Sequence, residues 1–320
     1  MKHLLVSAAL ICAAHPALAN RVFVTNERSN DITVLDGESF EVIGTYPAGN
    51  RPRGITISPD GTELYVCSSD DDLVRVFDPQ TMEQLHTLPS GPDPELFVLH
   101  PSGNPLFIAN EDDNIVTVVD TETHQMLAEI PVGVEPEGMG VSPDGSVVIN
   151  TSETTNMAHF IDTTTFEITA NVLVDSRPRF AQYNADGSKL YVTSEIGGTV
   201  SVIDPSTQQI IKKISFDING VLPEAIQPVG ARVTADGKTL FVALGPANRV
   251  AVIDAQTDEV VDYLLVGQRV WQLAFSPDEK FLYTTNGNSN DVSIIDVAAR
   301  KVVRSVQVGQ QPWGVVVAPD

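Results

Sequence analysis

Cysteine is nearly absent from this chain of 320 residues, which contains only Cys12 and Cys67. Cys12 lies in an N-terminal segment that we interpret below as cleavable, so Cys67 would be the single cysteine of the mature protein. One cysteine cannot form a disulfide within a chain, and it cannot build a cysteine-based zinc site. Cys67 falls in a strand-like segment, where we expect a buried free thiol.

Basic residues are also few. The chain has 19 Lys and Arg against 42 Asp and Glu, which gives a formal net charge of −23 at pH 7. This balance argues against a nucleic-acid partner, because phosphate binding needs clustered Lys and Arg. It also disfavours an anionic membrane surface. Such a charge suits solubility or a basic partner.

Long apolar runs are missing beyond the N-terminus, so we expect no membrane span. Residues 1–19 have the features of a secretory signal peptide. They begin with the basic Lys2, continue with a mostly apolar stretch from Leu4 to Ala14, and end on the small-x-small triplet Ala17-Leu18-Ala19. The mature protein, residues 20–320, is therefore expected in the periplasm or outside the cell.

Familiar catalytic signatures are missing as well. The sequence contains no Cys-x-x-Cys-His haem attachment site, no Gly-x-Ser-x-Gly turn and no phosphate-binding loop. The histidines of the mature chain lie in separate repeats, which is poor geometry for a zinc site; they are His86, His100, His124 and His159. No segment keeps a 3.6-residue apolar period, so we expect almost no helix.

The sequence does contain a repeat of about 42 residues. Strand-like segments close on an aspartate every 42 residues, with one step of 50, at Asp36, Asp78, Asp120, Asp162, Asp204, Asp254 and Asp296. A second position repeats in the same way, with Val270 in the sixth place, at Pro52, Pro94, Pro136, Pro178, Pro228 and Pro312. Strand-rich repeats of this length predict a β-propeller. Seven of them predict one all-β domain over residues 20–320, a seven-bladed propeller of four-stranded antiparallel blades.

Residues that recur in all blades are assigned to the scaffold, so each repeated aspartate is expected to hydrogen-bond the turn that follows it. The chain starts with a second-strand segment, Arg21–Asn26, and stops just after a first-strand segment. We therefore expect the closing blade to combine strands from both termini. Such closure removes a sheet edge that would otherwise stay unpaired.

Several stretches resemble a known family. Val22–Asn26, Leu190–Ser194 and Leu282–Asn286 resemble the repeat of YVTN-type β-propeller proteins. Longer, non-repeated stretches are similar to a narrower group, the β-propeller proteins associated with pyrroloquinoline-quinone-dependent catabolism. These stretches are Arg51–Ile55, Ser90–Phe97, Val134–Gly138, Asn150–His159, Ala243–Asn248 and Leu265–Trp271.

The resemblance covers residues 21–320. It implies a secreted seven-bladed propeller linked to quinoprotein-dependent oxidation of alcohols or related compounds and to an accompanying transporter, and it supplies no molecular activity. The adjacent cysteine pair and the tryptophan-containing blade motif of quinoprotein dehydrogenases are absent from the sequence. We therefore expect no bound cofactor in this chain, with a divalent cation as the one possibility left open.

The repeats differ most in two sets of loops that emerge on the same face of a propeller. These loops bring a set of candidate binding residues to the channel mouth: Arg51, Arg53, Glu95, Glu137, Glu153, Arg177, Arg179, Glu195, Arg269, Trp271 and Trp313. Glu27, Asp70, Glu111 and Asp112 reach the same rim. Mouths of closed β architectures are common ligand sites, and exposed Trp and Arg are typical interface anchors. The structural alternative is a ring of salt bridges between blades.

Blade four differs in its third strand, where His159 takes a place that small or polar residues hold in most other blades. One interpretation is a ligand-facing imidazole beside Glu153 and Asn156; the other is a histidine that hydrogen-bonds a neighbouring blade. Gln182 and Arg232 interrupt otherwise apolar inner strands. They either face the central channel or only form hydrogen bonds there.

We predict from these observations a monomeric, non-enzymatic binding or accessory protein that holds a protein partner or a small metabolite at the channel mouth. The first alternative is a propeller hydrolase or lactonase with a divalent cation, for which Glu95, Glu137, Glu153 or Glu195 would be a ligand or the general base. A structural propeller without a ligand is the second. The acidic runs 70–72 and 111–113 lack a calcium-loop spacing and are assigned to solvated loop tips.

Overall fold

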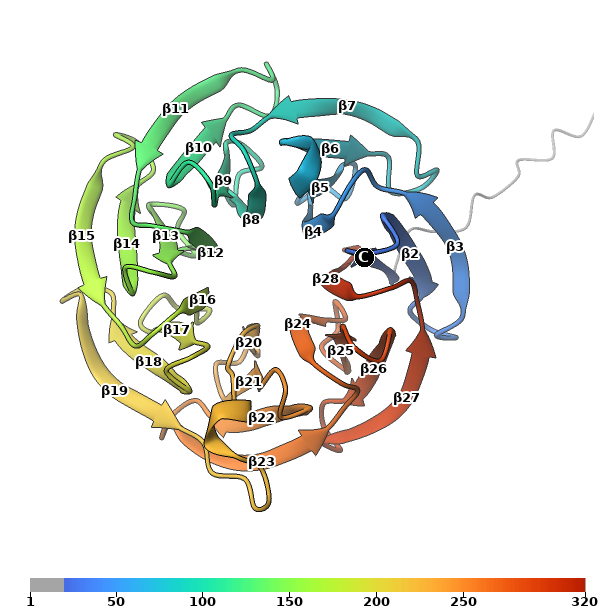
Figure 1. The fold of residues 1–320 in the computed structure, drawn as a ribbon, viewed down its shortest axis with the longest axis vertical. Coiled ribbons are helices and arrows are strands. Elements are labelled where there is room, and N and C mark those ends of the chain that lie inside the picture. The colour runs from blue at the N-terminus through green and yellow to red at the C-terminus, as the bar shows by residue number, and fades with distance from the viewer. Residues whose placement is uncertain (1–19, 320) are drawn as a thin grey trace, which may run out of the picture.

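Seven four-stranded antiparallel sheets stand around one axis in the computed structural model, which describes residues 20–319 (Figure 1). This arrangement confirms the predicted seven-bladed all-β propeller. Within the described residues, the only helical segments are two 3₁₀ turns, η1 (Ser69–Asp71) and η2 (Pro223–Ala225). The predicted signal peptide, residues 1–19, lies outside the described residues.

Each blade runs from an innermost strand at the channel to an outermost strand at the perimeter (Figure 1). The innermost strands are β4 (Pro52–Ile57), β8 (Pro94–Leu99), β12 (Pro136–Val141), β16 (Pro178–Tyr183), β20 (Ala231–Val233), β24 (Val270–Phe275) and β28 (Pro312–Val317). The second strands are β5 (Leu64–Ser68), β9 (Leu106–Asn110), β13 (Val147–Ser152), β17 (Leu190–Ser194), β21 (Thr239–Ala243), β25 (Phe281–Asn286) and β1 (Arg21–Asn26).

The two outer positions repeat in the same order. The third strands are β6 (Leu73–Phe77), β10 (Ile115–Val119), β14 (Met157–Asp162), β18 (Thr199–Asp204), β22 (Arg249–Asp254), β26 (Asp291–Asp296) and β2 (Asp31–Asp36). The fourth strands are β7 (Gln84–Pro89), β11 (Met126–Pro131), β15 (Ile168–Leu173), β19 (Gln209–Ser215), β23 (Glu259–Leu265), β27 (Lys301–Gln307) and β3 (Val42–Pro47).

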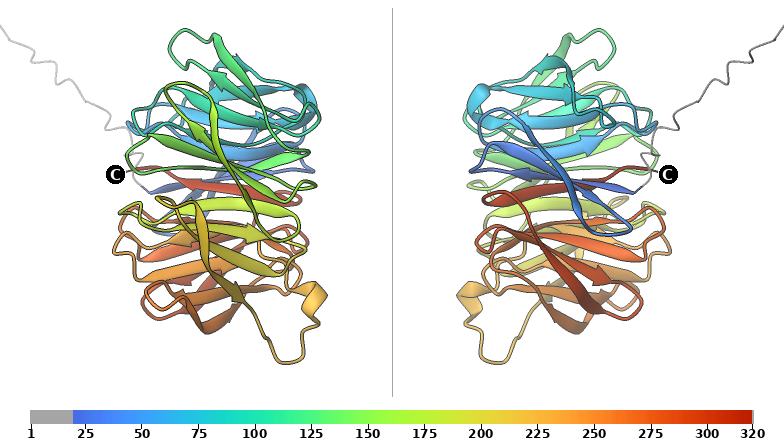
Figure 2. Two further views of the ribbon diagram at one scale, coloured as in Figure 1. Left: turned by 90° about the vertical axis from the view of Figure 1, so that its left-hand side faces the viewer. Right: turned by 90° about the vertical axis from the view of Figure 1, so that its right-hand side faces the viewer.

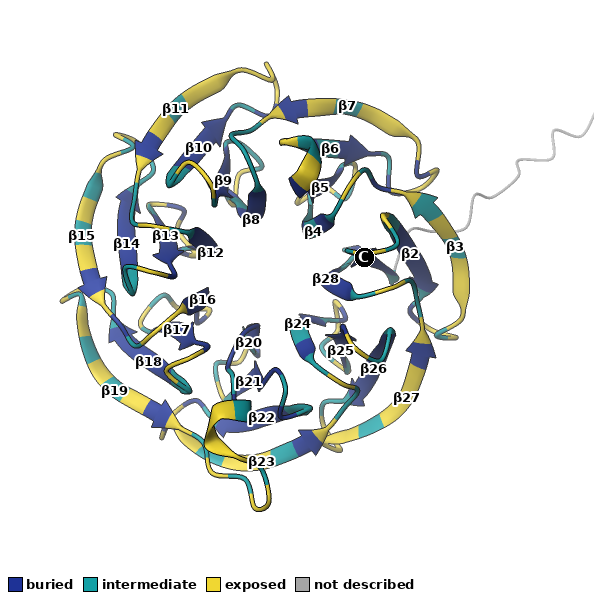
Figure 3. Cartoon of the chain, in the orientation of Figure 1, coloured by how far each residue is buried: buried dark blue, intermediate teal, exposed yellow. Residues whose placement is uncertain are grey.

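The apolar core lies between neighbouring blades. Second strands such as β5 and β9 are buried along their whole length, whereas the fourth strands β7 and β11 are mostly exposed (Figure 3). A strand covered on both faces needs a continuous apolar run, which explains the repeated Leu-Tyr-Val pattern. One register of the second strand is fully buried in every blade; it holds Phe23, Tyr65, Phe107, Ile149, Tyr191, Phe241 and Tyr283. Cys67 is a buried free thiol, as predicted.

The closing blade joins the two ends of the described chain. Its sheet order is β28-β1-β2-β3, with Val22 opposite Val317 and Val24 opposite Val315. This pairing confirms the expected closure. It also gives β1 a partner on both sides, so the ring has no open edge between its first and last strands.

The seven repeated aspartates have the predicted structural role. In every blade a carboxylate oxygen of this residue accepts a backbone N–H two or three residues later, as Asp162 does from Thr164 at 2.9 Å and Thr165 at 2.8 Å. These bonds fix the turn that leads into the fourth strand.

The longest departure from the repeat is the loop over residues 216–227, which contains η2 and lies at the perimeter of the fifth complete blade (Figure 2). Leu222 is exposed on it, whereas Ile226 is buried and anchors it. No helix among the described residues has the length and the apolar character needed to cross a membrane.

Truncation tests the importance of closure. A chain that ends at Gly309 lacks β28, so we expect it to lose the cooperative thermal transition of the full-length protein, because β1 and the facing channel strands then lose their partners. Circular dichroism during heating is the measurement. Deletion of Asn219 and Gly220, which are exposed in the loop over residues 216–227, is the control and should shift Tm by no more than about 3 °C. Equal melting of the truncated and the full-length chain would refute the closure role.

Candidate functional site

The positions on either side of the repeated proline form two layers at the channel mouth. The deeper layer takes one residue from each blade: Arg53, Glu95, Glu137, Arg179, Val229, Trp271 and Trp313. The outer layer holds Arg51, Asp93, Glu135, Arg177, Gln227, Arg269 and Gln311. A cavity of about 280 Å³ opens between them, lined by Arg51, Arg53, Asp93, Glu111, Glu137, Arg177, Arg179, Glu195, Arg269 and Trp271. Most of the predicted mouth residues are therefore brought together.

The residues of the outer layer share a backbone conformation that repeats from blade to blade. In six blades its residue has a left-handed conformation, with φ between 50° and 58°. The N–H of that residue donates to an Asn or Asp side chain 21 residues earlier, as Arg177 does to Asn156 Oδ1 at 3.0 Å. A side-chain acceptor that bonds the backbone in this way stabilises a turn. Asn156 is therefore a scaffold residue shared by most blades, which corrects its assignment as a ligand-binding residue particular to blade four.

The first half of the mouth is an ion network around Glu95, which is fully buried. Arg51 Nη2 donates to one of its carboxylate oxygens at 2.6 Å, and Arg53 donates to the other. Arg53 also contacts Glu27 at 3.0 Å. Burial raises the pKa of Glu95, but the charges of Arg53 and Arg51 outweigh that effect and leave its pKa below the ordinary value. Glu95 is therefore ionised.

The second half is centred on Arg179, which is only 5% exposed. Its guanidinium lies 2.7 Å from Glu137 and also donates to Glu153. Glu195 is shared between Arg177 at 3.3 Å and Arg269 at 2.7 Å. The salt-bridge ring that the sequence analysis held as an alternative is thus present, and its inner members, such as Glu95, Glu137 and Arg179, are buried, whereas Arg177 is exposed. Buried charges of this kind need near-complete pairing.

Not every acid in this network is ionised. Glu137 is 1% exposed, and its Oε2 has no hydrogen-bond partner among residues 20–319. Burial raises the pKa of Glu137 well above its ordinary value, and the charge of Arg179 does not compensate for it because Glu95 and Glu153 act in the same direction as burial. Glu137 therefore binds a proton more readily than an ordinary glutamate.

Asp93 and Glu111 form a pair of carboxyl groups with separated pKa values. Burial and the negative charge of Glu95 raise the pKa of Asp93 to about 6, against the opposing charge of Arg51. Burial and the same Glu95 raise the pKa of Glu111 to about 8. Arg51 Nη1 lies 2.9 Å from Asp93 Oδ1 but is not directed at it for a hydrogen bond, so this oxygen keeps a free lone pair. At neutral pH Asp93 is mainly ionised and Glu111 is mainly protonated.

The sequence analysis placed Glu111 at the rim but assigned the acidic run 111–113 to a solvated loop tip, and the structure corrects the second assignment for Glu111. Asp112 and Asp113 are exposed, but Glu111 is half-buried and lines the cavity. The signal that could have identified it is its register, because Glu111 precedes Glu153 and Glu195 by one and two repeats of 42 residues. All three lie in the loop between the second and third strands of their blades.

The acids around Glu111 are also the candidates for a cation site. In residues 20–319, Asp93, Glu95 and Glu111 are the only group of acids, histidines or cysteines close enough to share a metal, with one donor atom of each within 4.8 Å of the others. A hard divalent cation takes six or more oxygen ligands. Here both oxygens of Glu95 are already bound by Arg51 and Arg53, whose charges would repel a cation. The donor set fits a proton at Glu111 better than a divalent cation.

The two tryptophans differ in environment, and one prediction about them was wrong. Trp313 is 1% exposed and lies in the channel wall under Arg53, whose guanidinium carbon is 5.5 Å from the ring centre. It is therefore no exposed interface anchor. Trp271 is half-buried and lines the mouth cavity. Its ring is 4.2 Å from the guanidinium of Arg269 and 5.6 Å from that of Arg179, so it covers the apolar faces of two charged groups.

His159 does not line the mouth cavity. It is buried in β14, where its Nε2 accepts the N–H of Gly133 at 3.0 Å and its Nδ1 contacts the side-chain oxygen of Asn171. Burial lowers the pKa of His159, so the ring is neutral. Thr33 and Ser293 hold the same register in other blades, and each accepts an N–H in the same way at 3.3 Å. This geometry corresponds to the alternative in which the histidine joins neighbouring blades.

Two family models match parts of the sequence. The YNCE-like beta-propeller model matches residues 220–319, and the model "Lactonase, 7-bladed beta-propeller" matches residues 13–131. Each covers less than half of the chain, so together they support a β-propeller family without defining a narrower one. No curated protein matches the sequence.

Many solved structures share the fold. Hydrazine synthase from Kuenenia stuttgartiensis is 21% identical with a TM-score of 0.80, over 92% of this chain and 99% of that chain. A protein of unknown function from Desulfotomaculum acetoxidans is 15% identical with a TM-score of 0.81, over 94% and 100%. A putative 6-phosphogluconolactonase from Bacteroides fragilis is 19% identical with a TM-score of 0.78, over 93% and 97%. Identities of this size establish similarity of fold only.

The expected role as a non-enzymatic accessory protein of quinoprotein-dependent oxidation is overturned by these comparisons. The matched lactonase model describes enzymes, and its segment contains Arg51, Arg53, Asp93, Glu95 and Glu111 of the mouth. The match therefore favours the hydrolase alternative. None of the matches given above concerns a pyrroloquinoline-quinone protein, so that part of the resemblance stays a prediction.

Replacement of each tryptophan tests which of the two rings belongs to the protein core. We expect Trp313→Ala to destabilise the protein by about 3–5 kcal/mol, because it empties a fully buried site in the channel wall. Trp271→Ala should have a clearly smaller effect, since its ring is partly exposed. Denaturant unfolding followed by circular dichroism measures both. Equal stabilities of the two variants would contradict the assignment of Trp313 to the core.

Glu111→Gln tests the retained proton. The folded-state pKa of Glu111 is about 8, above the 4.5 of a free glutamate. Between these two pH values the folded protein therefore keeps a proton on Glu111 that the unfolded chain has released. The stabilising contribution of that proton is complete below about pH 4.5 and is lost as the pH rises to about 8. We expect Tm to fall more steeply from pH 5 to pH 9 in the wild type than in Glu111→Gln.

Asp112→Asn, a change at the exposed neighbouring position, should leave the wild-type pH dependence unaltered. Thermal melting across the pH range provides the comparison. Parallel curves for wild type and Glu111→Gln would show that the Glu111 carboxyl is not protonated, and a lower Tm of Glu111→Gln at pH 9 would indicate a bound cation instead.

Proposed function

We propose that this protein is a lactonase-like hydrolase that opens a cyclic ester in the mouth cavity. The observation that carries the proposal is the pair Asp93 and Glu111, whose carboxyl oxygens lie within 4.8 Å of each other and whose pKa values are about 6 and about 8. Two carboxyl groups with separated pKa values can act as base and acid at the same pH. The lactonase match over residues 13–131 supports this assignment, because that segment holds both residues.

The ionised Asp93 is the proposed general base. Its carboxylate, at the lining of the cavity, accepts a proton from a water molecule, and the water oxygen forms a bond to the carbonyl carbon of the lactone. The attacking oxygen and the ring oxygen are bound to the same carbon in the tetrahedral intermediate. A base and an acid within about 5 Å of each other can therefore serve both.

The protonated Glu111 is the proposed general acid. When the bond between the carbonyl carbon and the ring oxygen breaks, Glu111 gives its proton to that oxygen, which becomes the hydroxyl of the product. The product is a hydroxycarboxylic acid, which releases its carboxyl proton to solvent and becomes a hydroxycarboxylate. Exchange with water returns the proton from Asp93 to Glu111. Guanidinium groups of Arg51 and Arg269, which line the same cavity, offer hydrogen bonds to the negative charge that develops on the carbonyl oxygen.

The remaining mouth residues position this pair. Glu95 holds Arg51 and Arg53, and its negative charge raises both pKa values. Trp271 gives the cavity an apolar wall against which a sugar-like ring packs. The mechanism uses no cofactor. The predicted signal peptide makes the periplasm or the cell exterior the proposed compartment.

Kinetics with δ-lactones of hexonic acids, with and without a phosphate group, test this function. Hydrolysis can be followed as proton release in a weakly buffered indicator assay. We expect kcat/KM to be greatest between about pH 6 and pH 8, because Asp93 must be ionised and Glu111 protonated. Asp93→Asn and Glu111→Gln should each lower kcat/KM by roughly 10²–10⁴-fold.

Asp112→Asn is the matched control and should retain wild-type activity, since Asp112 is exposed on the same loop as Glu111. Absence of hydrolysis with every lactone, or full activity of both site variants, would refute the proposal. Activity that disappears with EDTA and returns with a divalent cation would retain the hydrolase and overturn the metal-free role of Asp93 and Glu111.

A further inference from the structure

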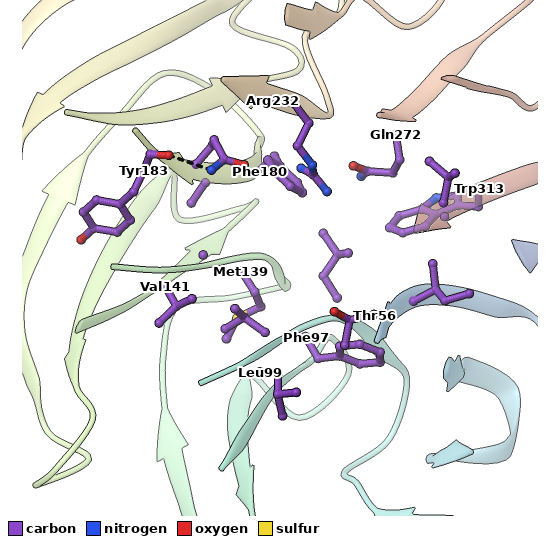
Figure 4. Close-up of a pocket in the computed structure, with 18 residues that line it drawn as sticks. Thr56, Phe97, Leu99, Met139, Val141, Phe180, Tyr183, Arg232, Gln272 and Trp313 are labelled. Atoms are coloured by element: carbon purple, nitrogen blue, oxygen red, sulfur yellow. Dashed lines mark hydrogen bonds between the residues drawn. The ribbon is translucent and has the colours of Figure 1, made fainter. Parts of the chain in front are cut away.

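A second cavity lies in the central channel and is distinct from the mouth cavity in its lining. It has a volume of about 310 Å³, and the innermost strands of the blades form its wall (Figure 4). Many of its lining residues have apolar side chains, among them Phe97, Leu99, Met139 and Phe180, while polar atoms form the larger part of its exposed surface. Arg232 on β20 and Gln272 on β24 both point into this space (Figure 4).

Arg232 is the first unusual feature of the channel. No carboxylate in residues 20–319 lies within 4.0 Å of its guanidinium, whereas each of the five arginines of the mouth has at least one such partner. Its Nη1 donates to the backbone carbonyl of Ala231 at 2.8 Å, and its guanidinium carbon lies 4.9 Å from the centre of the Phe180 ring. The charge is therefore placed against an aromatic face and left without a counterion.

The guanidinium retains its charge in this position. Burial lowers the pKa of Arg232 to about 10, and no nearby acid offsets the effect. At neutral pH the side chain is still protonated, so the channel contains one uncompensated positive charge. Arg232 is half-buried, so water in the channel solvates it when no ligand is present, and an ion of opposite sign can take the place of that water.

Gln272 is the second unusual feature. It is 6% exposed, and its Oε1 has no hydrogen-bond partner among the described residues. The amide oxygen and nitrogen exchange places when the side chain flips, so the same position can accept or donate a hydrogen bond. A buried amide without partners is unfavourable. The wall of one cavity thus holds the Gln272 amide, whose oxygen has no partner, and the Arg232 guanidinium, which has no counterion (Figure 4).

We propose that the channel cavity binds a small organic monocarboxylate, with Arg232 holding the carboxylate and Gln272 bonding a polar group of the ligand. One guanidinium balances one negative charge, and its planar fork matches a carboxylate. Apolar side chains of the lining, such as Phe97 and Phe180, offer contacts to an organic body that a fully hydrated inorganic anion such as phosphate does not make. This site does not depend on Asp93 or Glu111 and stands apart from the proposed hydrolase activity.

Ligand titration of the full-length mature protein tests the site. Trp313 lines the cavity, so its fluorescence reports binding, and isothermal titration calorimetry measures the affinity. The probes are butyrate and benzoate as monocarboxylates, 1-butanol as the neutral analogue, and phosphate and chloride as inorganic anions. We expect saturable binding of the monocarboxylates only.

Arg232→Met should raise the Kd for the monocarboxylates by about 10- to 100-fold, as expected for loss of a hydrogen-bonded charge. Gln272→Leu should raise it by about fivefold for a ligand with a hydroxyl group, such as 4-hydroxybutyrate. Arg28→Gln removes an arginine that is exposed far from the cavity lining, and should leave the Kd unchanged.

The stability of the ligand-free variants provides a second measurement. Because Arg232→Met removes an unpaired charge, its Tm without ligand should not fall below that of the wild type. Absence of monocarboxylate binding to the wild type, equal binding of phosphate or chloride, or unchanged affinity of a folded Arg232→Met variant would each overturn the proposal.

Discussion

The burial of charge at the channel mouth is the constraint on which the proposed site depends. Glu95, Glu137 and Arg179 are all less than a tenth exposed, so water cannot compensate their charges. Each mouth arginine therefore faces at least one carboxylate. The acids outnumber the arginines, and burial together with the neighbouring carboxylates raises the pKa of Glu111 to about 8 and that of Glu137 well above its usual range, so proton binding relieves the excess of negative charge. The acid–base pair of the proposed hydrolase is thus a consequence of how the network balances its charge.

The repeat makes this network possible because it gives the backbone at the mouth the same geometry in most blades, while the side chains differ from blade to blade. The left-handed residue before the proline position and the Asn or Asp that caps its N–H recur in six blades, so the backbone at the mouth is nearly the same around the ring. The side chains at these positions are free to differ. Arginine, carboxylate and tryptophan therefore meet on one axis although they come from blades up to 260 residues apart in the chain, as Arg53 and Trp313 do.

The sequence was sufficient to predict the features that recur. The spacing of the aspartates and prolines predicted the blades, the closure and the turn hydrogen bonds, because these are local and repeat with a fixed period. The individual mouth residues were harder to assign. Trp313 and Arg53 looked like exposed anchors on their own blades, and Glu111 looked like part of a solvated loop. Burial of each depends on side chains from other blades, which one repeat does not reveal. Asn156 could have been recognised from its register, since an Asn or Asp occurs at the same position in most blades.

The two cavities on the axis shift the pKa of an arginine in opposite directions. At the mouth, Glu95 and Glu137 raise the pKa of Arg53, and their attraction exceeds the unfavourable effect of burial. In the channel, burial acts alone on Arg232 and lowers its pKa. A fold that needed only stability could fill that position with an uncharged side chain, as the other innermost strands do at the same register with Thr56, Val98, Gly140, Gln182, Ala274 and Val316. Arg232 instead keeps an attractive potential for anions inside an apolar cavity, and Gln272 leaves a hydrogen-bonding group open beside it. The proposed carboxylate ligand would give Arg232 a counterion and Gln272 a hydrogen-bond partner in the same space.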